Sequence, residues 1–407
     1  MMISKIIVFG LLTTCLIRSF GEVVFFPTWL DEFLAVLFFC YCACIGRVSF
    51  KNKGNDFEKS VVATVLFVVL GVFTAFSHQI TEVSIGYDLF DILKYPVFFL
   101  LLSSVKIDKK MLLWIKKTYI ILNIPSIFFG LFQWFMANYR GVYIGLSIYR
   151  DRTLGARING FAGHNIALGF AMMINLIFLL EVSQKKWWHW VLIVGSSGCL
   201  LFAQSRIPIL LTILYILYKY VYLKARSMAR PIIFLLATIV LMVAFWGITA
   251  EAKSYSQSEE NTIRYMTIMK GGEVLSDYPI AGYGFGSYGT VESIKQMSPF
   301  YGAYPDEAAK KTIAKGTTRE AFAFQIIIET GLLGFVLYYY SFFASAFNAM
   351  RRKNYDLFYI ILFAFILQSF MNGIYQMPVF FIMCFMEGAS KHVLIGTCQE
   401  TNAAFDC

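Results

Sequence analysis

Apolar runs long enough to cross a lipid bilayer recur along this chain of 407 residues, and they constrain its fold more than any other feature. An α-helix rises 1.5 Å per residue, so about 20 apolar residues cross a hydrocarbon core roughly 30 Å thick. No water reaches the backbone there, so each run must satisfy its own N–H and C=O groups as a helix. We therefore predict an all-α integral membrane protein, a polytopic bundle of about twelve transmembrane helices with one large external loop. The expected spans lie near residues 3–20, 30–46, 60–77, 88–105, 118–137, 161–181, 188–204, 207–223, 231–250, 321–346, 355–372 and 374–394.

The composition and the placement of charge indicate a single polytopic membrane domain over residues 1–407. Hydrophobic residues make up 58% of the chain and charged residues 15%, whereas soluble domains carry about 25% charged residues. The net charge of +10 by itself suggests nucleic acid, but most lysines lie in alternate short connections between the apolar runs. That distribution is the positive-inside signal, so we expect both termini in the cytoplasm and no binding of nucleic acid.

Two expected external segments, 138–160 and 251–320, are long enough to fold. The first is rich in arginine, including Arg150, Arg152 and Arg157, and contains a single acidic residue. A planar guanidinium binds phosphate and carboxylate groups in a bidentate manner. The segment therefore predicts an anionic ligand at the external face, although anchoring at the membrane interface explains any one arginine equally well.

The second external segment is predicted to carry a short helix. Asn261 or Thr262 caps its start, and Asp277-Tyr278-Pro279 ends it. We expect this helix on the outer membrane surface, with Ile263, Met266 and Met269–Lys270 on its membrane-facing side. The loop Gly284–Gly289 then matches G-x-G-x-x-G, but a dinucleotide site needs a strand before it and a helix after it. Its glycines instead allow a tight turn or a close approach to a ligand.

Four motifs follow one another on the expected external side. They are Arg157-x-x-Gly160-Phe161 with His164-Asn165, then Ser205-Arg206, then the stretch from Arg264 through Asp277-Tyr278-Pro279 to Gly286, and finally Glu329-Thr330-Gly331-Leu332-Leu333-Gly334. In this order, over residues 150–340, they resemble the signature of the O-antigen polymerase/O-antigen ligase superfamily.

This resemblance implies a glycosyltransferase that acts on glycan linked to undecaprenyl pyrophosphate, at the periplasmic face of a bacterial inner membrane. A polymerase of this type passes the growing chain to the next lipid-linked repeat unit, and a ligase passes the finished chain to lipid A core. Neither reaction uses a nucleotide sugar, and the family implies no cofactor and no metal. The implied partners are the lipid-linked oligosaccharide and a chain-length regulator in the same membrane.

The resemblance and the chemistry together predict the site residues. Cleavage of the anomeric C–O bond leaves negative charge on pyrophosphate, which arginines stabilise in a water-poor cleft, and a carboxylate can accept the proton of the acceptor hydroxyl. We predict catalytic roles for Arg206, Arg264 and Glu320. The predicted substrate-binding residues are Arg150, Arg152, Arg157, His164, Tyr283 and Arg319.

One departure from the family pattern favours the polymerase over the ligase. Ligases of the family carry His-Asn at the position that Glu320 occupies here, eleven residues before Gly331. Glu320 could replace that histidine as the base, with Arg319 beside it on phosphate. A structural alternative places Glu320 in the first turn of a helix that Thr317 or Thr318 caps.

Further alternatives are the ligase, a transporter of lipid-linked glycan, and a membrane sensor or scaffold.

The second external segment is also rich in aromatic residues, which would stack on sugars or pack at the membrane interface. They are Tyr278, Tyr283, Phe285, Tyr288, Phe300, Tyr301 and Tyr304.

Overall fold

A computed structural model of the chain describes residues 2–19, 30–48, 55–144, 156–162, 165–182, 184–223, 263–305, 310, 321–370 and 380–389. Within these ranges the secondary structure is helical, apart from an isolated β-bridge between Val48 and Val105. The helices are α1 (Met2–Ser19), α2 (Leu30–Cys44), α3 (Asn55–Ser77), α4 (Glu82–Ser103), α5 (Lys109–Tyr139), α6 (Asn165–Glu181), α7 (Trp187–Phe202), α8 (Arg206–Ile216), the π-helix η1 (Leu217–Tyr222), α10 (Ile263–Asp277), α11 (Val291–Lys295), α12 (Phe300–Ala303), α14 (Phe322–Arg351) and α15 (Tyr355–Phe370). A further helical stretch covers Phe380–Ala389.

The predicted all-helical membrane class is confirmed. Among the described residues, three helical stretches can cross a membrane by length and composition: Phe57–Ser77, Lys109–Tyr139 and Phe322–Arg351. The other expected spans coincide, wholly or in part, with further described helices, except for 231–250, which lies outside the described residues. The number of spans, the extent of the external loop and the orientation in the membrane stay predictions.

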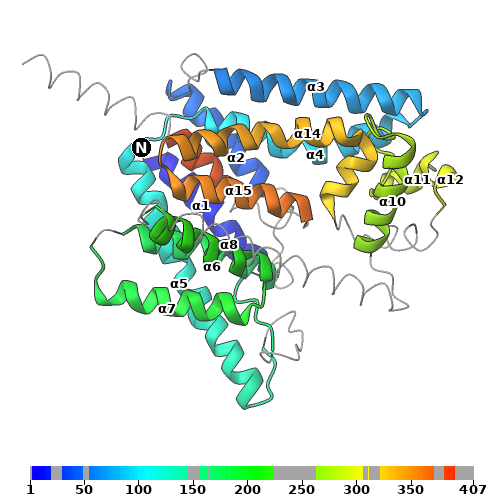
Figure 1. The fold of residues 1–407 in the computed structure, drawn as a ribbon. Coiled ribbons are helices and arrows are strands. Elements are labelled where there is room, and N and C mark those ends of the chain that lie inside the picture. Colours follow the sequence, from blue (N-terminus) through cyan, green and yellow to red (C-terminus); the bar gives the residue numbers. More distant parts are fainter. Residues whose placement is uncertain are drawn as a thin grey trace, which may run out of the picture.

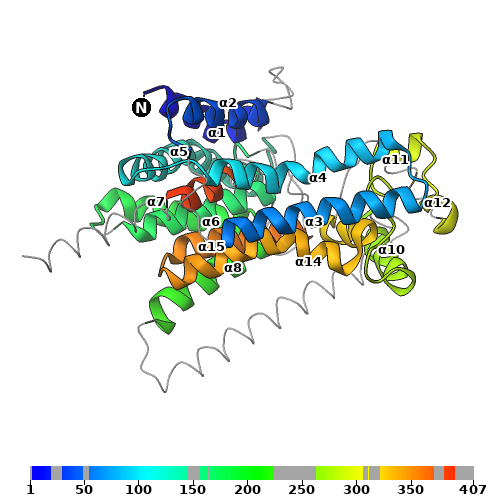
Figure 2. The same cartoon turned by 90° about the horizontal axis from the view of Figure 1, so that it is seen from above.

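Helices α3, α4 and α14 run side by side, whereas α5 descends obliquely from them (Figures 1 and 2). The α3–α4 turn lies at the same end as α10, α11 and α12. The N-terminus, the α4–α5 connection and the α14–α15 turn lie at the other end. We call the first of these the loop end, because it carries the loop that follows α10.

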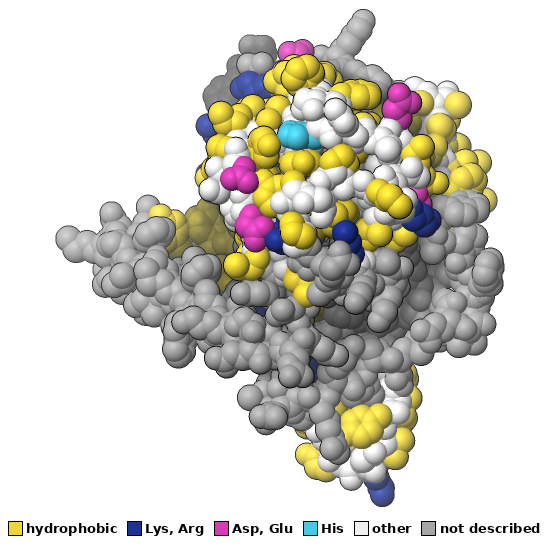
Figure 3. Space-filling view, turned by 90° about the vertical axis from the view of Figure 1, so that its right-hand side faces the viewer, with side chains coloured by type: hydrophobic (Ala, Val, Ile, Leu, Met, Phe, Trp, Pro, Cys, Tyr) yellow, Lys and Arg dark blue, Asp and Glu magenta, His cyan; other side chains and the backbone are white. Residues whose placement is uncertain are grey.

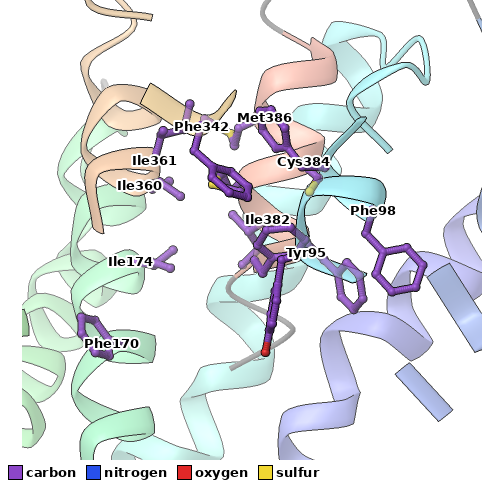
Figure 4. Close-up of a cluster of buried hydrophobic side chains, with 14 of the residues drawn as sticks. Tyr95, Phe98, Phe170, Ile174, Phe342, Ile360, Ile361, Ile382, Cys384 and Met386 are labelled. Carbon is purple, nitrogen blue, oxygen red and sulfur yellow. The ribbon is translucent and has the colours of Figure 1, made fainter. Parts of the chain in front are cut away.

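The centre of the bundle is a cluster of large apolar side chains from helices far apart in sequence (Figure 4). It brings together Tyr95 of α4, Phe170 of α6, Phe342 of α14, Ile360 of α15 and Ile382 of the stretch 380–389, all at most 2% exposed. Lipid tails are as apolar as these side chains, so close packing rather than exclusion of water holds such helices together.

At the end opposite the loop end, partly buried ion pairs join four elements. Lys116 of α5 lies 2.5 Å from the carboxylate of Asp356 in α15. Lys219 of η1 pairs with Glu181 of α6, and the hydroxyl of Tyr215 in α8 donates to the same carboxylate at 2.5 Å. Charges near the membrane are expensive unless they are paired, so these contacts fix the relative positions of α5, α6, α8 and α15.

Candidate functional site

Helix α14 is broken near its start, at Gly331. This residue has φ of 64° and ψ of −168°, a backbone conformation essentially restricted to glycine. Glu329-Thr330-Gly331 lies inside α14, which starts at Phe322, as the expected span 321–346 implies. The motif therefore marks a break between two helical segments.

The loop after α10 fills this break with its own backbone. The amides of Leu332 and Leu333 donate to the carbonyls of Pro279 and Ile280 at 2.9 and 3.1 Å. In the reverse direction, the amide of Tyr283 donates to Ile328 at 2.8 Å, and that of Gly284 donates to Glu329 at 2.6 Å. Backbone groups that a helix break frees must find partners where water is scarce. The loop that follows Asp-Tyr-Pro and the backbone around Glu-Thr-Gly therefore hydrogen-bond to each other in both directions. We call this pair of segments the interlock.

The glycines of the loop allow it to touch neighbouring helix backbones. Gly284 has φ of +98°, and a Cβ atom there would lie 2.2 Å from the Cα of Ala75 in α3. Gly286 has φ of +74°, and its Cβ would lie 2.5 Å from the carbonyl carbon of Ser84 in α4. The glycines were expected to allow a tight turn or a close approach to a ligand. The close approach observed is to the backbones of α3 and α4.

A buried polar network lies beneath the loop. The carboxylate of Asp88 in α4 accepts the amide of Gly286 at 3.1 Å and the side-chain amide of Gln325 in α14 at 3.3 Å. That amide also reaches the carbonyl of Tyr288 at 3.3 Å and the carboxylate of Glu329 at 3.5 Å. Asp88, Gln325 and Glu329 are at most 1% exposed. Sequence reasoning missed Gln325 entirely, since nothing in its neighbourhood along the chain marks it as polar and buried.

The aromatic residues of this segment pack mainly on one another. Apart from Tyr278, those expected to stack on sugars are at most 8% exposed, so most of their surface packs against protein. The ring of His78, the first residue after α3, stacks on Tyr283 at 4.1 Å, which covers one face of this predicted substrate-binding residue. Tyr304 donates to the carboxylate of Asp277, the last residue of α10, at 2.5 Å. Burial, together with this hydrogen bond, raises the pKa of Tyr304, so its hydroxyl is a proton donor at neutral pH.

The predicted short helix is present as α10, and it runs across the loop end of the bundle (Figure 1). The expectation that Met266 faces the membrane is wrong. Met266, Thr267 and Val274 are buried at 7%, 2% and 0% exposure, whereas Met269 is 48% exposed. Gly271 lies on the same buried side, where a Cβ would meet the ring of Phe324 in α14 at 2.9 Å. The apolar side of α10 is therefore satisfied by protein contacts.

A second group of predicted residues meets around the α7–α8 turn. The amide of Ile158 donates to the carbonyl of Phe202 at 3.3 Å, and the side chain of Asn165 donates to that of Ala203 at 3.1 Å. These contacts bring the segment of Arg157 and the start of α6 against the turn that precedes Arg206. Arg206 begins α8 with an exposed side chain, and the positive end of a helix adds to its attraction for an anion.

Several predicted residues lie outside the described residues, namely Arg150, Arg152, His164, Arg319 and Glu320, and so does the side chain of Arg264. The backbone of Arg264 belongs to the first turn of α10. Helix α14 begins at Phe322, after Ala321 in a left-handed conformation with φ of 61°. The alternative interpretation of Glu320 as a first-turn acid capped by Thr317 or Thr318 concerns residues outside those that the structure describes.

The loop end seen face-on mixes apolar and charged surface. On its described part, hydrophobic side chains are interspersed with single acidic and basic ones (Figure 3). Among the described residues, no group of three or more His, Cys, Asp or Glu side chains could hold a metal ion.

Residues 191–339 match the family model described as O-antigen ligase. The match runs from α7, through α8 and α10, to the segment of α14 beyond its break, and so contains the whole interlock. It confirms the resemblance to the O-antigen polymerase/ligase superfamily. A comparison with curated proteins found no match.

Proposed function

We propose that the protein is a membrane glycosyltransferase of the O-antigen polymerase type. It would transfer a glycan chain from undecaprenyl pyrophosphate onto the next lipid-linked repeat unit, at the periplasmic face of a bacterial inner membrane. The observation that carries the proposal is the family match, which supports a function of the ligase/polymerase type and contains Arg206, Arg264 and Glu320. In the proposed orientation both termini are cytoplasmic, and segments 138–160 and 251–320 are periplasmic.

The proposed reaction is a displacement at the anomeric carbon. A hydroxyl of the acceptor sugar attacks this carbon, the bond to the pyrophosphate oxygen breaks, and the electron pair leaves with pyrophosphate. Arg206 and Arg264 stabilise the charge that develops on the leaving group. Glu320 accepts the proton of the attacking hydroxyl.

The remaining predicted residues would bind the two substrates. Arg157, in the segment held against the α7–α8 turn, is suited to the pyrophosphate, and Arg319 to the same group from the other side. Arg150 and Arg152 would extend this basic surface, while His164 and Tyr283 would contact the glycan. A chain-length regulator in the same membrane is the proposed protein partner.

The ligase is the second candidate, because the matching family is described as O-antigen ligase. Glu320 in place of the family's histidine favours the polymerase. A transporter is less well supported. Broken helices in transporters leave backbone groups free for the substrate, whereas those at the break of α14 are taken by the protein's own loop.

The test is a gel of surface lipopolysaccharide from a strain that lacks the gene, complemented with wild type, Arg206→Ala or Lys295→Ala. Lys295 is an exposed basic residue of α11 and serves as the matched control. We expect core with a single repeat unit in the deleted strain, and a full ladder with wild type and the control but not with Arg206→Ala. Bare core with polymer left on its carrier would establish the ligase instead. An unchanged ladder in the deleted strain would refute both functions for this glycan.

A further inference from the structure

We infer that Tyr288 is a positioning residue, which clamps α10 to the start of α14 and so holds the first turn of α10, with Arg264, in a fixed relation to α14. The inference rests on the proposed function for the role of Arg264. The contacts of Tyr288 itself are independent of that function.

Tyr288 touches both segments through two different groups. Its hydroxyl lies 3.1 Å from the hydroxyl of Thr267, which stands three residues, or about one helical turn, after Arg264 in α10. Its carbonyl accepts the side-chain amide of Gln325 at 3.3 Å, five residues after Glu320 and in the first turn of α14. A single residue of the loop therefore links the helix that carries Arg264 to the first turn of α14.

At the end of this link away from α10, Gln325 is hydrogen-bonded to α4. Its side-chain amide donates to the carboxylate of Asp88 in α4, and that carboxylate accepts the amide of Gly286, two residues before Tyr288. Asp88, Gln325, Tyr288 and Thr267 are at most 2% exposed. Hydrogen bonds inside protein face little competition from water, so this chain of contacts transmits the position of α4 to α10.

Such a clamp matters because displacement of a pyrophosphate demands accurate placement of the groups around it. A shift of about 1 Å in a catalytic group can cost about a hundredfold in rate. Arg264 is in the first turn of α10, where a helix end frays most easily, and Thr267 is the first buried polar contact that follows it.

The hydroxyl of Tyr288 can be removed without removing its packing. Its ring lies 5.1 Å from that of Phe300, and this contact persists in Tyr288→Phe. The hydroxyl of Thr267 can then turn to the carbonyl one helical turn earlier, a common alternative for threonine in helices. The variant should therefore fold, with the clamp on α10 released.

The first readout is hydrogen exchange of the α10 amides, measured by mass spectrometry on the full chain in lipid nanodiscs. We expect Tyr288→Phe to raise the exchange rate of this segment about fivefold, as for loss of one hydrogen bond. The matched control is Tyr338→Phe, which removes another fully buried tyrosine hydroxyl, bonded to Ile92 of α4 and remote from α10. Unchanged exchange in Tyr288→Phe, or an equal rise in the control, would overturn the inference.

The second readout is the rate of glycan transfer between lipid-linked repeat units. We expect Tyr288→Phe to lower kcat about tenfold with little change in KM, and to have no further effect when Arg264→Ala is already present. An equal loss in both backgrounds would show that Tyr288 does not act through Arg264. If the wild type transfers no glycan, the proposed function fails, and the exchange of α10 still decides whether Tyr288 is the clamp.

Discussion

Substitution of Gly331 by alanine tests the interlock between α14 and the loop after α10. The φ of 64° and ψ of −168° at this position cost a residue with a side chain of the order of 1–3 kcal/mol. The new Cβ would also lie 2.4 Å from the carbonyl carbon and oxygen of Ile280. Both are backbone atoms, so the loop must move. The bonds from Leu332 to Pro279 and from Leu333 to Ile280 then break, at about 1 kcal/mol each. The sum is a local loss of about 3–5 kcal/mol.

The measurement is the unfolding temperature of the purified protein, together with hydrogen exchange over residues 279–290. We expect a lower midpoint, exchange in this loop faster by two orders of magnitude or more, and loss of the polysaccharide ladder in cells. Gly302→Ala is the control, because this glycine of α12 is exposed and no atom lies within 4 Å of its Cβ. A midpoint and an exchange pattern equal to those of the wild type in Gly331→Ala would refute the interlock as a source of stability.

Two further predictions concern helix packing at the two ends of the bundle. Gly272→Ala should stabilise α10 by about 0.5–1 kcal/mol, because nothing lies within 4 Å of its Cβ. Gly271→Ala should destabilise the protein, because the new Cβ presses on Phe324. Thermal unfolding measures both, and equal unfolding temperatures for the two variants would contradict the packing of α10 on α14. Asp356→Asn should cost about 3 kcal/mol by stranding Lys116, whose ammonium it pairs with at 2.5 Å. The double exchange of the two residues should recover part of that loss in chemical unfolding, and no recovery would contradict a direct pair.

At the loop end, two motifs can be recognised in the sequence, but the structural role of only one of them can be predicted from it. Asp277-Tyr278-Pro279 and Glu329-Thr330-Gly331 stand out as stretches of unusual residues, and the first was expected, correctly, to end a helix. The second falls inside the expected span 321–346, and nothing along the chain predicts that the helix is broken there. Only the contact between Gly331 and Ile280 reveals the break, and these residues are some fifty positions apart.

The sequence by itself determined the helical membrane class, the approximate helix ranges and the family resemblance. These follow from run length, charge placement and motif order, all of which are local in the chain. The tertiary structure alone decided that α14 is broken, that its break is filled by the glycine loop, and that Asp88 and Gln325 join helices from distant parts of the chain. A buried hydrogen bond depends on which atoms the fold brings within about 3 Å, and neither Asp88 nor Gln325 carries a local sign of that partner.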